Sequence, residues 1–355
     1  MIIVRRKTRE INLGNLKIGG TNPVIVQSMI KNRLEDMNAV REEIRQLQYC
    51  GCEIIRVAIV QKDSIAYLKN LLKSRLFIVP VVADIQFDYS LAIEALKAGV
   101  ECVRINPGNI GGTEKVEKIV NEAKKRKAAI RIGVNSGSID KRFLRKSNSN
   151  HLEAMIYSTL DTISLFEKIG FFNFKISAKA SSVMDTVSAY QVLSEKVDYP
   201  LHLGVTEAGP LFSGSIKSAT GIGILLSMGI GDTIRFSLTD VSSSEVRAAY
   251  TILSCLGLRK YGIDIISCPT CSRTKINLKS VVEEVEGITN IISKNIKIAI
   301  MGCIVNGPGE AKEADLGIAF GKEKAAIFRK GKIIKRVKSS KAIEEFKKEL
   351  NNFII

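Results

Sequence analysis

From about residue 24 to 257, short aliphatic runs alternate with longer segments in which apolar residues fall three and four positions apart. Eight such runs occur, at 23–28, 54–60, 78–85, 102–108, 129–135, 174–179, 201–207 and 233–238. Spacing of three and four is typical of one helix face, whereas parallel strands buried on both faces read as nearly continuous Val, Ile and Leu. Eight strand–helix units predict an α/β fold, a (β/α)8 TIM barrel. A doubly wound open sheet is the alternative, because a strand count does not prove that the sheet closes.

The pattern changes after Gly257. The following residues predict a helix over 278–291, a strand over 296–301, a hairpin from 315–320 and 325–337, and a helix from 340 to about 351. This part is too short for a second barrel but long enough for a small α+β domain. We therefore predict a TIM-barrel domain over residues 1–258 and a small α+β domain over residues 259–355.

The chain is strongly basic, with a formal net charge of +17 from 53 Lys and Arg against 36 Asp and Glu. Such an excess favours an anionic partner: nucleic acid, an acidic protein, a phosphorylated substrate or a membrane surface. No basic run is interleaved with aromatic residues, which argues against nucleic acid as the partner.

Several features bear on where the protein works. The N-terminus turns basic at Arg5 without an apolar signal-peptide core. No uninterrupted apolar run approaches the roughly 18 residues of a membrane-spanning helix. Seven cysteines, an odd number, point to a reducing compartment, where clustered thiols bind metal or carry out chemistry. We therefore expect a cytoplasmic protein with no membrane partner.

Basic residues recur at the strand ends that face the active site of a parallel barrel, the carboxyl ends. Five of the eight predicted strands carry Lys or Arg there, inside apolar runs where an unpaired cation is costly to bury. With neighbouring Asn and Ser, the candidate anion-binding residues are Arg56, Arg104, Asn106, Arg131, Asn135, Lys175, Arg235 and Ser237. A structural ion pair is an equal alternative for any single cation, but five together favour a binding site.

The chemistry of this set suggests its ligand. Arginine offers two-pronged donors that match phosphate, and Asn, Ser and glycine amides complete such a site. The set predicts a small polyanionic substrate, in particular a diphosphate. Asp84 and Glu207 are the acidic residues among these cations and are candidates for proton transfer or for holding a substrate hydroxyl. Structural pairing with a neighbouring arginine is the alternative for each carboxylate.

Three of the seven cysteines lie in the C-terminal part, in turns flanked by Gly or Pro. Cys268 and Cys271 form a C-x-x-C motif, and Cys303 follows in a Gly-rich loop. A C-x-x-C alone fits a redox disulfide, half a zinc site or coincidence, whereas a third cysteine favours metal. Zinc is normally closed by four N or S ligands, and no fourth cysteine or histidine lies nearby. A four-iron four-sulfur cluster on three cysteines leaves one iron open to an oxygen ligand or a substrate, and Glu310 is the nearest oxygen candidate.

Segments along essentially the whole chain resemble one family, 4-hydroxy-3-methylbut-2-en-1-yl diphosphate synthase, in its short bacterial two-domain form. In the barrel they are VIVQSM (24–29), IIRVAI (54–59), VADIQFD (82–88), VRINPGNIG (103–111), RIGVNSGS (131–138), KISAKAS (175–181), HLGVTEAG (202–209) and IRFSLT (234–239). The most specific segments are SCPTCSR (267–273) and MGCIVNGPGEAKEADLGIA (301–319).

The resemblance implies an iron–sulfur oxidoreductase of non-mevalonate isoprenoid biosynthesis. Its reaction is the reductive ring-opening and dehydration of 2-C-methyl-D-erythritol 2,4-cyclodiphosphate to 4-hydroxy-3-methylbut-2-en-1-yl diphosphate. Two electrons come from reduced flavodoxin or ferredoxin through a 4Fe-4S cluster. The implied cluster ligands are Cys268, Cys271, Cys303 and Glu310, of which Glu310 yields its place to the substrate oxygen. The anion-binding residues carry over unchanged, with Asp84 and Glu207 as acidic partners.

The resemblance also implies an assembly. The family forms a head-to-tail homodimer in which the cluster domain of one subunit covers the barrel mouth of the other. The barrel would then be the substrate-binding domain, and residues 259–355 would form the cluster-binding domain.

Two interpretations from other classes remain open on the residues alone. One is a basic nucleic-acid-binding protein with a structural zinc site, which needs a further zinc ligand near Cys303. The other is a non-redox barrel enzyme that acts on a phosphorylated pterin or sugar and carries a merely structural C-terminal domain.

Overall fold

The computed structural model describes residues 2–135, 139, 141–274, 276–289, 294–303, 309 and 311–354. The chain divides into two compact units, Met1–Arg259 and Lys260–Ile355. This division lies one residue after the boundary expected from the sequence. Within the described ranges, no helix combines the length and the apolar composition needed to cross a bilayer.

The first unit is a ring of parallel strands. Its eight strands are β3 (Ile25–Met29), β4 (Ile54–Ile59), β5 (Val81–Ile85), β6 (Cys102–Ile105), β7 (Ala129–Asn135), β8 (Phe174–Lys179), β9 (His202–Leu203) and β11 (Thr233–Ile234). They pair in chain order from β3 to β8, and β11 lies between β9 and β3. A parallel bridge between Ile176 and Leu201 makes the remaining junction, from β8 to β9. The predicted TIM barrel is confirmed, and the open-sheet alternative is wrong.

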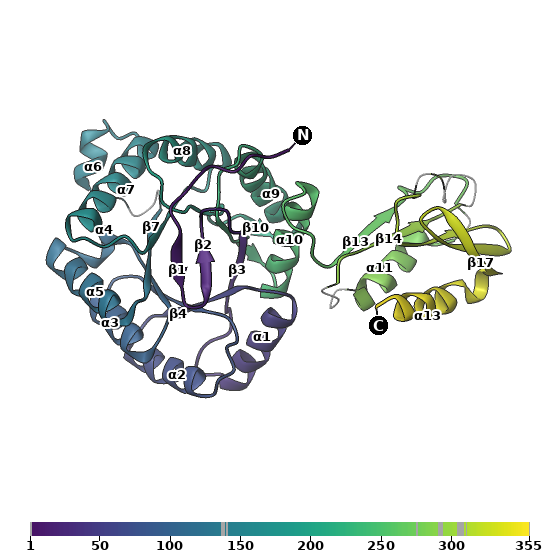
Figure 1. The fold of residues 1–355 in the computed structure, drawn as a ribbon, viewed down its shortest axis with the longest axis horizontal. Coiled ribbons are helices and arrows are strands. Elements are labelled where there is room, and N and C mark those ends of the chain that lie inside the picture. Colours follow the sequence, from purple (N-terminus) through teal and green to yellow (C-terminus); the bar gives the residue numbers. More distant parts are fainter. Residues whose placement is uncertain are drawn as a thin grey trace. The chain divides into compact units, whose positions relative to one another are not determined.

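Helices surround this ring (Figure 1). They are α1 (Met37–Tyr49), α2 (Lys62–Lys73), α3 (Tyr89–Ala98), α4 (Pro107–Ile110), α5 (Thr113–Arg126), α6 (Lys141–Lys146), α7 (His151–Lys168), α8 (Val183–Lys196), α9 (Leu211–Ser227) and α10 (Ser242–Cys255). The inner face of α1 shows the predicted apolar spacing, with Val40, Ile44 and Leu47 buried. Asp36 begins this helix because its carboxylate accepts a hydrogen bond from the Ala39 amide.

The last two barrel strands, β9 and β11, are shorter than the runs 201–207 and 233–238 predict. The residues beyond them form a separate parallel pair, β10 (Gly209–Pro210) and β12 (Leu238–Thr239). Directly after β9, a β carbon on Gly204 would lie 2.6 Å from Lys179 Nζ and 2.7 Å from the Arg235 carbonyl oxygen. The backbone is therefore crowded at the point where the regular β9 ladder ends, and only glycine fits there.

A short hairpin closes the amino-terminal end of the barrel, and the sequence analysis did not predict it. Its strands are β1 (Ile11–Leu13) and β2 (Leu16–Ile18). Its buried residues Ile11, Leu13 and Ile18 form one apolar cluster with residues at or next to the start of five barrel strands, namely Ile25, Ile54, Val82, Cys102 and Ala129. The hairpin therefore leaves the carboxyl end of the strands as the open end of the barrel.

Leu13→Ala is expected to lower the free energy of unfolding of the barrel by about 2–5 kcal/mol, because it leaves a cavity in this fully buried cluster. The matched control is Leu16→Ala, a half-buried residue of the same hairpin. Its loss should be clearly smaller. Urea unfolding followed by circular dichroism measures both, and equal losses would show that the hairpin does not close the core.

In its described residues, the second unit is a five-stranded sheet with two α-helices. Its strands are β13 (Ile263–Ser267), β14 (Ile296–Met301), β15 (Leu316–Phe320), β16 (Lys324–Arg329) and β17 (Lys332–Lys338), in that spatial order. The helices α11 (Leu278–Thr289) and α13 (Ala342–Ile354) share one apolar core with the sheet. The predicted segment 325–337 forms the hairpin β16–β17, which turns at Lys330 and Gly331. Residues 290 and 291 of the predicted helix 278–291 lie outside the described residues.

Candidate active site

Four charged residues lie side by side inside the barrel and are here called the charged row: Asp84, Arg104, Arg131 and Lys175. The strand register pairs Asp84 with Arg104, Arg104 with Arg131, and Arg131 with Lys175. Residues in register on neighbouring strands point to the same face of the sheet. None of the four is more than 5% exposed. Because the interior of a TIM barrel is normally filled with aliphatic side chains, such a row indicates a binding or catalytic function.

Asp84 is the acceptor at one end of the charged row. Its carboxylate lies 3.2 Å from Arg104 Nη1 and 3.7 Å from Arg56 Nε. Burial by itself would raise the pKa of Asp84, but Arg56, Arg104 and Arg131 together lower that pKa below its ordinary value. Asp84 is therefore a carboxylate at neutral pH. It can accept a hydrogen bond or a proton and has no proton of its own to give.

Arg104 is held from two sides. Besides Asp84, its Nη2 donates to the carbonyl oxygen of Gly133 at 3.2 Å. A β carbon at Gly133 would lie 2.3 Å from Arg104 Nε, so the guanidinium occupies the space that a side chain on β7 would take. Glycine at this position thus allows the arginine to lie across the barrel interior.

Arg131 and Lys175 have unused donors. Arg131 Nε donates to Ser177 Oγ at 3.0 Å, while Arg131 Nη1 and Lys175 Nζ are buried with no hydrogen-bond partner among the described residues. Burial lowers the pKa of Arg131 and lowers that of Lys175 to about 8. Unpaired buried donors are costly, so these two groups are suited to an anion that enters the barrel.

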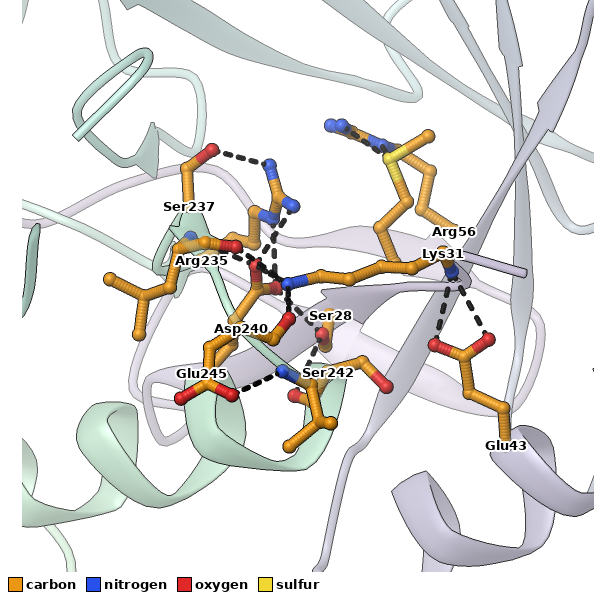
Figure 2. Close-up of polar contacts among 12 residues, drawn as sticks. Ser28, Lys31, Glu43, Arg56, Arg235, Ser237, Asp240, Ser242 and Glu245 are labelled. Carbon is orange, nitrogen blue, oxygen red and sulfur yellow. Dashed lines mark hydrogen bonds and ion pairs between the residues drawn. The ribbon is translucent and has the colours of Figure 1, made fainter. Parts of the chain in front are cut away.

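Arg235 and Ser237 meet just after β11. Arg235 Nη1 donates to Ser237 Oγ at 3.1 Å, and the other side of the guanidinium faces the buried Glu245 carboxylate (Figure 2). Burial and the neighbouring Arg56 lower the pKa of Arg235. Arg235 thus lies within electrostatic range of Arg56 and of Asp84 in the charged row.

Lys179 is a cation of the barrel interior that the sequence analysis missed. It ends β8, is 6% exposed and lies in register with Asn135. Burial, reinforced by Arg131 and Arg56, lowers its pKa well below the ordinary value for lysine. Strand alternation could have found it, because Lys175, Ser177 and Lys179 must share one face.

The remaining predicted residues lie nearer the barrel rim. Asn106 is buried and accepts a hydrogen bond from the Gly108 amide at 3.2 Å, which begins helix α4. Asn135 is half-buried at the end of β7. Glu207 is exposed in the turn before β10, with a left-handed φ of +53°. The structure does not bring Glu207 into contact with the described cations.

The cysteines of the C-terminal unit follow two neighbouring strands. Cys268 comes directly after β13 and Cys303 soon after β14, and these strands are parallel with Ser267 opposite Ile300. Both cysteines therefore lie at the same edge of the sheet. Cys271 is exposed in the loop that follows Cys268. Glu310 lies outside the described residues, and within those residues no three His, Cys, Asp or Glu side chains are grouped as a metal site.

The surroundings of these thiols suit thiolate ligands. The Gly302 amide donates to Cys268 Sγ at 3.2 Å, and the Arg273 amide lowers the pKa of Cys271. Amide donors favour the ionised sulfur that binds metal and tune iron–sulfur centres. All seven cysteines are free of disulfide bonds. The donor set thus fits a thiolate-bound metal centre.

A barrel closed at one end, with buried charged side chains in its interior, and a small unit with three free thiols are together typical of an enzyme. Two family models match the chain: the GcpE TIM-barrel domain over residues 8–250 and the GcpE protein C-terminal domain over residues 264–352. The chain belongs to the GcpE family.

Its relatives are similar over their whole length. One relative, from Caldanaerobacter subterraneus subsp. tengcongensis, is 51% identical, and the match covers 100% of this chain and 99% of the relative. Another from Maridesulfovibrio salexigens is 48% identical and covers 99% and 98%. Both are named 4-hydroxy-3-methylbut-2-en-1-yl diphosphate synthase (flavodoxin). These names support the oxidoreductase interpretation and not the nucleic-acid alternative.

Solved structures add support for the fold alone. The Plasmodium falciparum HPPK-DHPS structure is 13% identical with a TM-score of 0.50, and the match covers 70% of this chain and 51% of that one.

Proposed function

We propose that this protein converts 2-C-methyl-D-erythritol 2,4-cyclodiphosphate to 4-hydroxy-3-methylbut-2-en-1-yl diphosphate. The reaction takes up two electrons and one proton and releases one water as the ring C–O bond breaks. The observation that carries the proposal is the charged row: buried cations with unused donors, in a chain of the GcpE family. A cyclic diphosphate is the small polyanion that such donors match.

The barrel residues bind and orient the substrate in this proposal. Arg104, Arg131, Lys175 and Arg235 would hold the two phosphate groups, with Arg56, Asn106, Asn135 and Ser237 around them. Asp84, ionised and tied to Arg104, would keep that guanidinium in place and accept a substrate hydroxyl proton in a hydrogen bond. Glu207 would serve as the second acidic group at the barrel rim. Barrel residues 1–258 thus form the substrate-binding domain.

Residues 259–355 would form the cluster-binding domain. Cys268, Cys271 and Cys303 would hold a 4Fe-4S cluster, with Glu310 as the exchangeable fourth ligand. When bound, such a cluster supplies electrons one at a time. The chain contributes the Gly302 amide, which donates to Cys268 Sγ, and the Arg273 amide, which lowers the pKa of Cys271.

The partners follow from the same proposal. The donor would be reduced flavodoxin, as in the names of the relatives, with ferredoxin as the alternative. A head-to-tail homodimer would bring the cluster domain of one subunit to the barrel of the other. Seven free cysteines fit a cytoplasmic location, where thiols stay reduced.

Turnover of the cyclic diphosphate tests the proposal. Protein purified without oxygen and supplied with reduced flavodoxin should release the linear diphosphate, detected by mass spectrometry. Iron and acid-labile sulfide are measured on the same sample. A protein with full iron and sulfide but no product would overturn the proposed reaction, whereas stoichiometric zinc without iron would overturn the proposed cofactor.

Lys175 predicts a pH dependence. Its ammonium is present below the folded-state pKa of about 8 and lost above it, so kcat/KM for the anionic substrate should fall as pH rises through about 8. The Lys175 ammonium has the opposite effect on the stability of the fold. The folded-state pKa lies below the ordinary 10.5, so the buried ammonium costs stability below pH 8, and this cost declines toward pH 10.5.

Lys175→Met should therefore weaken substrate binding and raise the free energy of unfolding at pH 7. Measurements of kcat/KM and urea unfolding from pH 6 to 10 check both effects. Lys97→Met, on the exposed face of α3, is the matched control and should leave both profiles unchanged. A variant that loses stability at pH 7 would contradict the expectation.

A further inference from the structure

Glu245 is a buried carboxylate with an unusual number of donors. It lies in the first turn of α10 and its side chain is fully buried. Oε1 accepts from Arg235 Nη2 at 3.1 Å, from the Leu238 amide at 3.0 Å and from Lys31 Nζ at 3.0 Å. Oε2 accepts from Arg235 Nε at 3.2 Å and from Ser28 Oγ at 2.8 Å. Five donor groups from two segments of the barrel, 28–31 and 235–238, thus converge on one carboxylate (Figure 2).

The hydrogen bonds to Glu245 fix the orientation of the Arg235 guanidinium. Two parallel hydrogen bonds to a carboxylate hold a guanidinium in one plane and one direction. With Nε and Nη2 engaged, Arg235 presents Nη1 to Ser237, and its free edge faces away from Glu245. A long side chain loses conformational entropy when it binds a ligand. Because the Glu245 contact already orders Arg235, little further entropy is lost when the ligand binds.

Lys31 supports Glu245 and is not itself free to bind an anion. Its ammonium has three donors, and these meet Glu245, the Leu238 carbonyl at 2.7 Å and the Asp240 carbonyl. Through these hydrogen bonds, Lys31 connects the loop after β3 to β12 and to Asp240, which follows β12.

We propose that Glu245 is a positioning residue of the anion-binding site: it acts through Arg235, whose guanidinium it holds in the orientation that binds the substrate diphosphate. The inference rests on the proposed function, because it takes Arg235 as a phosphate-binding residue. It adds a residue that contacts no substrate atom and sets the direction of one that does.

The first experiment compares two buried carboxylates. Glu245→Gln keeps the shape but places an amide against donors, whereas Glu43→Gln alters a carboxylate that meets Lys31 and Asn32 and does not touch Arg235. Binding of inorganic pyrophosphate to the full-length chain is measured by calorimetry. Glu245→Gln should weaken binding about tenfold or more, as expected for loss of a charged hydrogen-bond pair, and Glu43→Gln by less than about threefold.

The second experiment asks whether Glu245 acts through Arg235. Arg235→Met leaves Glu245 with Lys31, Ser28 and the Leu238 amide, so the carboxylate keeps buried partners. If Glu245 works through Arg235, adding Glu245→Gln to Arg235→Met weakens pyrophosphate binding no further. In turnover, Glu245→Gln should raise KM and change kcat little, because the diphosphate is held in ground and transition states alike.

Each outcome decides the matter. A tenfold loss in Glu245→Gln that vanishes in the Arg235→Met background supports the inference. A loss no larger than that of Glu43→Gln, or one that persists undiminished without Arg235, overturns it while the proposed function stands. If Arg235→Met binds pyrophosphate as tightly as the unaltered chain, the proposed anion site at Arg235 itself fails, and the inference fails with it.

Discussion

Cys303→Ser is expected to abolish both the bound iron and the turnover of the cyclic diphosphate while the barrel stays folded. Three thiolates are the minimum that the proposed cluster needs, and serine is a poor ligand for iron in such a centre. Cys303 lies in the second compact unit, so its loss leaves the contacts of Met1–Arg259 intact.

Iron, acid-labile sulfide and the broad absorbance at about 400 nm measure the cluster, which should fall from about four irons per chain to near zero. Circular dichroism reports the barrel. Cys255→Ser is the matched control, an exposed cysteine of α10 that should keep iron and activity unchanged. Full iron content in Cys303→Ser would remove Cys303 from the ligand set.

Arg104→Met is expected to lower kcat/KM for the cyclic diphosphate by about 100- to 1,000-fold. This corresponds to the loss of charged hydrogen bonds in a water-poor site, about 3–4 kcal/mol. The guanidinium of Arg104 is 3.2 Å from Asp84 and sits in the middle of the charged row. Asp84 would keep Arg56 at 3.7 Å, so no buried carboxylate is left without a cation.

Arg259→Met is the control. Arg259 forms an ion pair with Glu53 at 3.2 Å and donates a hydrogen bond to the Val24 carbonyl. Val24 lies just before β3, at the opposite end of the strands from their carboxyl ends. The kcat/KM of Arg259→Met should change by no more than about threefold, as for an arginine outside the site. Steady-state kinetics with both variants checks the expectation. Equal losses would mean that stability, and not substrate binding, limits activity in Arg104→Met.

The barrel itself could be predicted from the sequence because its signal is local. Each buried parallel strand must be aliphatic along its whole length, and each helix must carry one apolar face, so the eight units appear as a repeated pattern. The hairpin β1–β2 escaped because three-residue strands are too short to show a period. The shortening of β9 and β11 depends on crowding around Gly204, which involves residues from β8 and from the segment after β11.

The site was only partly predictable. The position of Lys or Arg at the strand ends identified the cations of the charged row, because an unpaired charge in an apolar run is costly to bury. Pairing could not be predicted in the same way: Asp84 with Arg104, and Arg235 with Glu245, are contacts between different elements. Glu207, expected among the cations, is exposed in its turn, and Glu245 was missed because its run in α10 reads as an ordinary helix start.

The sequence by itself determined which residue types stand at which strand ends, and the C-x-x-C motif with its third cysteine. These features predict the class of ligand, an anion, and the class of cofactor ligand, a thiolate. Only the tertiary structure decided which charges are paired and which donors remain unused. Pairing depends on distances of about 3 Å between side chains far apart in the chain, and the strand register and closure of the barrel set those distances.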